Sequence, residues 1–518
     1  MEDFQKQTGM ESDMKFNVLE FLEETERKYP TRTAVDDGTV CLSWRELKDL
    51  SQRMGSLFCE ICDQGEPVVI LAEKSARILA AMFGVVYAGC FYVMVDPSQP
   101  AARIREILKI LEPQLVVLND ENEELLDEAG YTKRKYILQK SIGKKVDIER
   151  LQQIRRQSRG TDLLYGIFTS GSTGTPKGII VSHQAVIDFI SHFVEVLGFH
   201  DKDRIGNQAP FDFDVSVKDI YTSILTGAAL VLIPKELFSL PSKLLDYLCE
   251  KEVTVLIWAV SALSMVTALK GLDYRVPGSV RTICFSGEVM PVRQLRMWQE
   301  ALPDTAFVNL YGPTEITCNC TYYPVKRIFA DGEKIPIGRG FPGRMVFLLD
   351  DQDKVINAPG KIGEICVAGE SLSEGYYRNP EETKKRFRMI NFSGQKEKRC
   401  YCTGDLGYYD EEGLLYFSGR KDFQIKHMGH RIELEEIEST LNQVEGVERS
   451  CCLMDERRNR LIAFYLGEAD PGDVRAYLKK HFPVYMIPHK IQRTEEMPLN
   501  KNGKTDRNYF RKKLEVGM

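Results

Sequence analysis

Strand-like and helical segments alternate along most of this chain, and this alternation limits the folds available to it. An apolar run at residues 68–73 has the pattern of a buried strand, a helical stretch follows at 75–88, and a second strand-like run occupies 91–95. The same order recurs in two further blocks, at residues 229–233, 242–251 and 253–257, and at residues 281–285, 292–301 and 307–310. This repetition predicts an α/β fold with mainly parallel sheets.

The length of 518 residues exceeds what one hydrophobic core usually serves, so we expect two domains. The weakest link lies at residues 419–422, after a hairpin-like arm at 413–418. Downstream, the apolar spacing of residues 431–442 predicts an amphipathic helix. We therefore divide the chain into a large N-terminal domain, residues 1–421, and a small, mobile α+β C-terminal domain, residues 422–518.

Charge and hydropathy bear on possible partners and location. The 69 basic and 75 acidic residues give a net charge of −6, which does not favour nucleic-acid binding. Residues 78–95 carry no charge, but Gly84 and Gly89 interrupt the run, which we interpret as a buried helix and strand rather than a membrane span. The polar, acid-containing start has no secretory or transit character, so a cytoplasmic location is expected.

Thirteen cysteines raise the question of disulfides or metal. Cys59 and Cys62 form one CxxC pair, yet no second pair completes a zinc set. Cys400 and Cys402 are two apart, a spacing that suits one face of a strand. We expect reduced thiols that pack as small hydrophobic groups.

The stretch at residues 165–178, YGIFTSGSTGTPKG, is dense in glycine, serine and threonine and follows an apolar run. Glycines let backbone N–H groups converge on an anion, hydroxyls add donors, and Lys177 supplies a charge suited to polyphosphate. The spacing is not that of a Walker A loop, because Pro176 precedes the lysine and Gly178 follows it. From residues alone, a flexible linker is the alternative interpretation.

This stretch resembles the nucleotide loop of the adenylate-forming superfamily, which includes acyl-CoA synthetases, luciferase and peptide-synthetase adenylation domains. Further motifs of that family follow in the expected order over nearly the whole chain. They are AGCFYVMVDP at 88–97, NLYGPTE at 309–315, GEI to GYY at 363–377, YCTGD at 401–405, GRKD with GHRIE at 419–433, and NGKTDR at 502–507.

The resemblance implies ATP and Mg²⁺ as cofactors. It assigns Glu315 to Mg²⁺, Thr314 to the α-phosphate, and Lys504 to charge stabilisation during adenylation only, so these three are the candidate catalytic residues. It makes Asp422 the hinge on which the small domain rotates and brings Gly429 to a thiol tunnel. The candidate nucleotide-binding residues are Thr169, Ser170, Gly171, Ser172, Thr173, Gly174, Lys177, Asn309, Tyr311, Gly312, Asp405, Arg420 and Lys504.

In amino-acid-activating members of the family, an aspartate at the position of Asp214 pairs with the substrate ammonium. The alternative for Asp214 is that it caps a helix starting at Val215. The sequence around Asp214 is similar to that of D-alanine–carrier protein ligases and of peptide-synthetase domains. Positions that match the family's substrate pocket are Asp214, Val215, Lys218, Trp258, Cys284, Ser286, Leu310, Cys318 and Asn319.

Two of these positions bear on which acid is activated. Trp258 is expected to shrink the pocket because it is the largest side chain available. Lys218 departs from a D-alanine pocket: pointing inward it favours an acidic or hydrogen-bonding side chain, and pointing outward it favours alanine or another small residue. The sequence leaves both alternatives open, with a small amino acid preferred.

No carrier motif follows Lys504, so the resemblance implies a stand-alone ligase that transfers its aminoacyl group to a separate phosphopantetheinylated carrier protein. The alternative function is an acyl-CoA synthetase acting on a non-amino carboxylic acid, which Asp214 disfavours.

Overall fold

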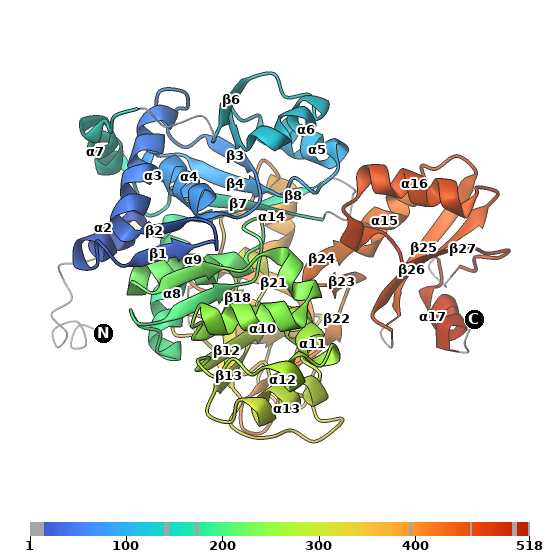
Figure 1. Ribbon diagram of the computed structural model, residues 1–518. Coiled ribbons are helices and arrows are strands. Elements are labelled where there is room, and N and C mark those ends of the chain that lie inside the picture. Colours follow the sequence, from blue (N-terminus) through green and yellow to red (C-terminus); the bar gives the residue numbers. More distant parts are fainter. Residues whose placement is uncertain are drawn as a thin grey trace.

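The computed structural model describes residues 15–138, 144–170, 176–392, 396–455, 458–499 and 505–515. These residues form a large N-terminal domain and a smaller C-terminal domain, which projects from one side of it (Figure 1). The large domain holds two extended, mainly parallel sheets with helices packed on them, and a third, antiparallel sheet. The predicted α/β class is therefore confirmed.

The largest sheet has nine strands in the order β15-β14-β13-β12-β11-β9-β10-β1-β2. From β13 to β1 all neighbours are parallel, and only the edge strands pair antiparallel. Because parallel strands share their direction, the carboxyl ends of β11, β12 and β13 meet at one edge of the sheet. The strands are β1 Thr33–Asp36, β2 Cys41–Ser43, β9 Arg204–Asn207, β10 Ala229–Leu232, β11 Val255–Ala259, β12 Thr282–Ser286, β13 Ala306–Tyr311, β14 Thr321–Pro324 and β15 Arg339–Gly340.

A seven-stranded sheet has the order β19-β8-β7-β4-β3-β5-β6. β7, β4, β3, β5 and β6 are parallel, whereas β8 and β19 add antiparallel strands at one edge. β7 and β8 flank the predicted phosphate loop. The strands are β3 Pro67–Leu71, β4 Phe91–Val95, β5 Leu115–Leu118, β6 Arg134–Ile137, β7 Leu163–Thr169, β8 Lys177–Ser182 and β19 Gly375–Tyr376.

Helices cover the faces of both sheets (Figure 1). Their starts follow local rules: Ser43 and Glu46 form a capping box before α3, and Ser75 accepts a hydrogen bond from the Ile78 N–H before α4. The helices of the large domain are α2 Leu19–Lys28, α3 Trp44–Phe58, α4 Ala76–Tyr87, α5 Ala101–Leu111, α6 Glu123–Glu128, α7 Ile148–Gln157, α8 His183–Leu197, α9 Val215–Thr226, α10 Pro241–Glu250, α11 Val260–Ala268, α12 Gly271–Tyr274, α13 Val292–Ala301 and α14 Pro380–Arg386, with short 3-10 turns η1 Asp120–Asn122, η2 Lys235–Ser239 and η3 Thr314–Ile316.

The antiparallel sheet has β21 at its centre, paired with β18, β20 and β22. β22 ends at Arg420, so this sheet carries the chain to the start of the C-terminal domain. Its strands are β16 Met345–Leu349, β17 Val355–Ile356, β18 Gly363–Ala368, β20 Phe387–Ile390, β21 Lys398–Tyr409 and β22 Leu415–Arg420.

The C-terminal domain begins with a hairpin and continues as a three-stranded sheet with helices. Its core contains Ile432, Ile437, Leu461 and Tyr465, which are all buried. Its elements are β23 Gln424–His427, β24 His430–Glu433, α15 Leu434–Leu441, β25 Val447–Asp455, β26 Arg460–Gly467, α16 Pro471–His481, η4 Val484–Met486, β27 Lys490–Arg493 and α17 Arg507–Glu515.

The predicted strands and helices of the two large sheets are present within two residues of their expected bounds. The predicted helix at residues 431–442 needs correction, because only Leu434–Leu441 is helical. Residues 430–433 are extended instead, since they pair with β23 from Gln424↔Glu433 to His427↔His430. The expected division after residue 421 falls between β22 and β23.

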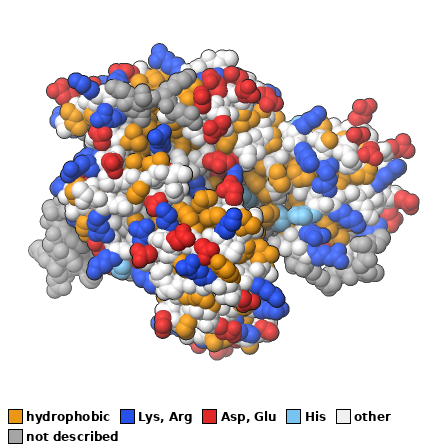
Figure 2. All heavy atoms as spheres, in the orientation of Figure 1, with side chains coloured by type: hydrophobic (Ala, Val, Ile, Leu, Met, Phe, Trp, Pro, Cys, Tyr) orange, Lys and Arg blue, Asp and Glu red, His pale blue; other side chains and the backbone are white. Residues whose placement is uncertain are grey.

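Figure 2 shows acidic and basic side chains interspersed over this face of both domains, rather than one broad basic face. Among the described residues, no helix is both long and apolar enough to cross a bilayer. The uncharged run at residues 78–95 instead forms α4 and β4, which are buried.

Two glycines let α3 and α4 pack closely. A Cβ atom on Gly84 would lie 2.7 Å from the Met54 Cβ, and one on Gly55 would lie 2.6 Å from the Tyr87 Cβ. Neither distance is tolerated without movement of a helix, so this interface requires both glycines.

We predict that Gly84→Ala destabilises the protein. Alanine favours the helix by about 1 kcal/mol, but overpacking costs about 1–3 kcal/mol. The unfolding temperature in calorimetry should therefore fall by about 2 °C. Gly278→Ala is the control, because a Cβ there meets nothing within 4 Å. An unfolding temperature of Gly84→Ala above that of the parent protein would contradict the prediction.

Candidate active site

The predicted phosphate loop joins β7 to β8, but only part of it falls in the described ranges. Gly171, Ser172, Thr173 and Gly174 lie outside the described residues, as does Lys504. Thr169 ends β7. The Lys177 ammonium, at the start of β8, lies 2.9 Å from a Glu382 carboxylate oxygen. Burial acts to raise the pKa of Glu382, but the hydrogen bond and charge of Lys177, with the charges of Lys385 and Arg386, hold that pKa below its ordinary value.

Ser170 contacts the C-terminal domain. Its hydroxyl donates to the Arg431 carbonyl at 2.9 Å and accepts from the Glu433 N–H at 3.1 Å. One end of the phosphate loop is therefore bound to β24.

The predicted adenine and magnesium motif follows β13. Asn309 donates to the Pro336 carbonyl at 2.8 Å, and the Tyr311 hydroxyl donates to Asp405 at 2.6 Å. A Cβ on Gly312 would lie 2.5 Å from the Asn319 Cα, so the chain returns past this point only because the residue is glycine.

Glu315 is a buried carboxylate on η3, with 1% of its side chain exposed. Arg431 Nη1 donates to both of its oxygens at 2.8 Å, and the Tyr376 hydroxyl donates to one of them at 2.6 Å. Burial acts to raise the pKa of Glu315, but the charge of Arg431 and the hydrogen bond of Tyr376 hold it below the ordinary value. The carboxylate is therefore ionised and fully engaged.

Asp405, Arg420 and Asp422 form a chain of charges at the junction of the domains. Arg420 donates to Asp405, and it binds Asp422 through Nε at 2.6 Å and Nη2 at 2.9 Å. This two-pronged contact fixes the guanidinium between the predicted ribose ligand and the predicted hinge.

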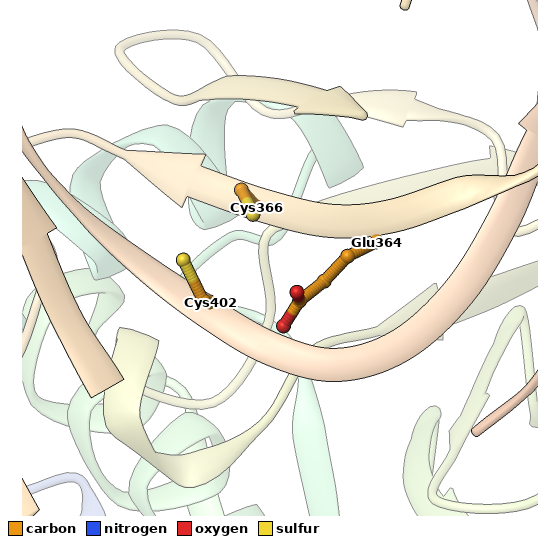
Figure 3. Close-up of side chains that lie close together, drawn as sticks. All are labelled: Glu364, Cys366 and Cys402. Carbon is orange, nitrogen blue, oxygen red and sulfur yellow. The ribbon is translucent and has the colours of Figure 1, made fainter. Parts of the chain in front are cut away.

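Figure 3 shows Glu364, Cys366 and Cys402, whose ligand-type atoms lie within 4.8 Å of one another. The Glu364 carboxylate accepts from the Gly404 N–H at 2.9 Å and lies 3.2 Å from the Lys421 ammonium. Because its oxygens are already engaged, we interpret Glu364 as an anchor for the turn before Asp405. All thirteen cysteines are free thiols, and the two in Figure 3 are buried, as their expected role as hydrophobic groups requires.

Asp214 immediately precedes α9, as predicted, but its side chain makes no hydrogen bond that caps the helix. Instead its carboxylate accepts from the Thr314 hydroxyl at 2.7 Å. The Cys318 thiol donates to its backbone carbonyl at 3.0 Å. Burial raises the pKa of Asp214, and the Thr314 hydrogen bond and the charge of Lys218 oppose that shift. The structure thus joins the expected substrate ligand Asp214 to the expected phosphate ligand Thr314.

Lys218 lies one turn further along α9 and is buried. Its ammonium donates to Asn319 Oδ1 at 2.9 Å and to Ser286 Oγ at 3.3 Å. The side chain therefore points toward the other predicted pocket positions and does not extend to solvent. The remaining expected pocket residues Val215, Cys284, Leu310 and Cys318 are buried as well.

The structure does not bring Trp258 into this group, so the expectation that it shrinks the pocket needs correction. Side chains alternate along β11, and Trp258 packs with Ile283 and Phe285 on the face of the sheet opposite Cys284. Its indole donates to the Gly206 carbonyl at 2.8 Å. The neighbour that shares the Cys284 face is Ile257, which is paired with Cys284 in register.

The hairpin β23–β24 carries the expected Gly429 and also Lys426, which the sequence pattern did not indicate. The Gly429 N–H donates to Glu288 at 2.8 Å, and Lys426 lies directly opposite Arg431 in the hairpin register. Desolvation lowers the pKa of Lys426, and the charges of Asp405 and Asp214 oppose that shift. Recognising a hairpin instead of a helix at residue 431 would have pointed to Lys426.

Residues 22–377 match the family of AMP-binding enzymes, and residues 436–504 match the AMP-binding enzyme C-terminal domain. The chain therefore belongs to the AMP-binding enzyme family, which confirms the resemblance seen in its motifs.

Several proteins are similar to this chain in sequence. L-proline--[L-prolyl-carrier protein] ligase of Streptomyces coelicolor is 33% identical, with 85% of this chain and 86% of that protein covered. D-alanine--D-alanyl carrier protein ligase of Listeria monocytogenes is 30% identical, with 95% of this chain and 98% of that protein covered. Tyrocidine synthases 1 and 2 of Brevibacillus parabrevis are 30% and 31% identical over 95% of this chain, which spans only 44% and 13% of their lengths.

Solved structures of adenylation domains have the same fold as this chain. A nonribosomal peptide synthetase protein with adenylation and carrier domains has a TM-score of 0.82 at 25% identity, covering 96% of this chain and 84% of that one. The adenylation domain AlmE of Vibrio cholerae has a TM-score of 0.83 at 20% identity, covering 98% and 99%, which supports the fold alone. The chain is therefore an adenylate-forming enzyme related to carrier-protein ligases and peptide-synthetase adenylation domains.

We predict that Arg431→Gln loosens the C-terminal domain. The change removes the cation from the buried Glu315 carboxylate, and breaking one partner of a buried ion pair costs about 3–5 kcal/mol. Trypsin should then cleave faster after Lys421, whose side chain is 37% exposed beside the hinge. The control is Arg449→Gln, an exposed arginine of β25 in the same domain. Equal cleavage rates in both variants would contradict the prediction.

Proposed function

We propose that this enzyme activates an amino acid as an aminoacyl-adenylate and passes the aminoacyl group to the phosphopantetheine thiol of a separate carrier protein. The observation that carries the proposal is Asp214, a buried carboxylate that caps no helix and lies against Thr314. Such a carboxylate suits a substrate ammonium. Among the described residues no ammonium or guanidinium lies within 4.0 Å of this carboxylate, and a fatty or aryl acid would bring none to pair with it.

In the first step, a carboxylate oxygen of the amino acid attacks the α-phosphorus of ATP, and pyrophosphate leaves. The loop from Thr169 to Lys177 would hold the polyphosphate, and Asn309, Tyr311 and Gly312 the adenine. Asp405 and Arg420 would bind the ribose. We assign Lys504 to charge stabilisation in this step, since a positioned ammonium suits the charge that builds on the α-phosphate.

Glu315 fits Mg²⁺ by its chemistry, because hard cations prefer carboxylate oxygen. The metal, when bound, would neutralise phosphate charge. Arg431 binds both oxygens of Glu315 in the arrangement described here. The hairpin and the metal thus compete for one carboxylate.

In the second step, the carrier thiol sulfur attacks the acyl carbon, the bond from that carbon to the phosphate oxygen breaks, and AMP leaves. The arrangement described here supports this step because hairpin β23–β24 occupies Ser170 and Glu315, both expected ATP ligands. It also seats Gly429 against Glu288, beside the substrate residues. Rotation about Asp422 would exchange this arrangement for the adenylating one.

The alternative is an acyl-CoA synthetase, since the fold is shared with o-succinylbenzoate CoA synthetase of Bacillus subtilis at a TM-score of 0.83 and 20% identity. Asp214 opposes this alternative, because a non-amino carboxylic acid brings no ammonium to pair with its carboxylate.

The test is ATP–pyrophosphate exchange with both enantiomers of the standard amino acids and with a panel of non-amino carboxylic acids. We expect exchange with an amino acid and a loss of at least about 100-fold in Asp214→Asn and in Lys504→Ala. The control is Asp304→Asn, which changes an exposed aspartate. Exchange with non-amino acids only would favour the acyl-CoA synthetase.

A buried ion pair between the domains provides a test of the second step. Arg103 of α5 lies 3.1 Å from Glu436 of α15, and their side chains are 6% and 0% exposed. These residues belong to different domains, so the pair stabilises only arrangements that bring the two helices together.

We predict that Arg103→Met slows transfer to the thiol by about 10-fold or more, because Glu436 loses a buried cationic partner. Pyrophosphate exchange should change by less than about threefold, because it uses the other arrangement. Single-turnover transfer from the preformed adenylate measures the first quantity. Lys109→Met, an exposed residue of α5, is the control, and the double swap Arg103→Glu with Glu436→Arg should recover part of the loss. Equal losses in both steps would disprove a selective role.

A further inference from the structure

Lys218 places a cation inside the substrate site. Only one helical turn of α9 separates it from Asp214, so both side chains lie on the same side of the helix. Its ammonium is bound to Asn319 and Ser286, at 2.9 and 3.3 Å, and 1% of the residue is exposed. The lysine therefore does not reach bulk water by extending its chain.

This ammonium has no close anion. Within the described parts of the chain, no carboxylate oxygen lies within 4.0 Å of it, and its two acceptors are neutral. The carboxylate of Asp214 interacts favourably with it from a longer distance. Asp219 does so as well, but that residue also has Lys74: burial raises the pKa of Asp219 to about 7, and the amide of Asn207 and the charges of Lys218 and Lys74 oppose the shift.

Lys74 is held close to Asp219 by shared contacts. Its ammonium donates to the Asn207 side-chain oxygen at 2.9 Å and to the Gln208 carbonyl at 2.9 Å, while Asn207 donates to Asp219 at 2.7 Å. Lys74 thus acts on Asp219, whereas Lys218 acts on both Asp219 and Asp214, and Lys426 also acts on Asp214.

Binding of an amino acid changes this balance, an argument that rests on the proposed function. When the substrate ammonium pairs with Asp214, Lys218 loses its long-range counter-charge, and a neutral side chain would leave one cation unmatched in a buried site. A carboxylate on the substrate side chain restores neutrality. We propose that the activated amino acid is acidic, with a side-chain carboxylate bound by Lys218.

The neighbouring groups favour a carboxylate over an amide. Asn319 and Ser286 both use an oxygen to accept from Lys218, which leaves the Asn319 amide N–H₂ and the Ser286 hydroxyl proton as donors. A carboxylate accepts from all three groups, whereas a side-chain amide brings an N–H₂ that meets donors. The apolar walls, Ile257, Cys284 and Leu310, add no competing acceptor among their side chains.

The experiment compares aspartate and glutamate with asparagine, glutamine and alanine in pyrophosphate exchange by the full chain. We expect kcat/KM for one acid to exceed that of its amide by about 100-fold or more, since a site of buried donors rejects a mismatched isostere. Lys218→Met keeps the length of the side chain but removes the charge, and should abolish this preference. A wild-type enzyme that uses a neutral amino acid best overturns the inference while leaving amino-acid activation intact.

Binding provides a second measurement that needs no turnover. Non-hydrolysable aminoacyl-sulfamoyl adenosines carrying aspartyl, asparaginyl, glutamyl and glutaminyl groups can be titrated calorimetrically against wild-type and Lys218→Met protein. We expect tighter binding of an acidic analogue to the wild type, by about 100-fold, and similar binding of acid and amide to the variant. Equal affinities in the wild type overturn the inference. Weak binding of all four analogues, with tight binding of an acyl analogue that lacks the ammonium, refutes the proposed function instead.

Discussion

The ion pair between Glu315 and Arg431 is the contact on which the relation between the two domains depends. Glu315 is supplied by the turn after β13 and is buried, and Arg431 is supplied by β24 and is partly buried. A buried carboxylate tolerates burial only while a cation or metal balances it. Because Arg431 can be withdrawn only with its strand, the charge state of one residue in the large domain is tied to the position of the whole C-terminal domain.

This dependence would give the proposed two-step reaction a physical order. The hairpin that neutralises Glu315 also binds Ser170, next to the predicted phosphate loop, so the groups expected to receive ATP are engaged by protein. Lys426 of the same hairpin interacts favourably with the charges of Asp405 and Asp214. In the proposed reaction, the hairpin would thus remove one set of contacts and deliver another, which would couple pyrophosphate release to thiol transfer.

The fold was largely predictable, because buried parallel strands such as β4 and β11 are continuous apolar runs that local pattern reports directly. The start of the helix predicted at residue 431 was not predictable. The amphipathic spacing begins at that residue, but pairing with β23 makes the first residues of the segment extended. The same error hid Lys426. Trp258 was misplaced for a different reason. When a motif is aligned one residue out of register, a strand side chain is assigned to the opposite face of the sheet. Contacts between distant segments, such as Arg103 with Glu436, leave no local pattern.

For the substrate residues, the sequence identified the positions and the structure determined the direction of a side chain. The sequence identified Asp214 and Lys218 but left the direction of Lys218 open, because a lysine on a helix can extend outward or bend inward with the same spacing. Burial among Ser286 and Asn319 decides between these. The proposed acidic substrate would add both charges at once, with its ammonium at Asp214 and its side-chain carboxylate at Lys218.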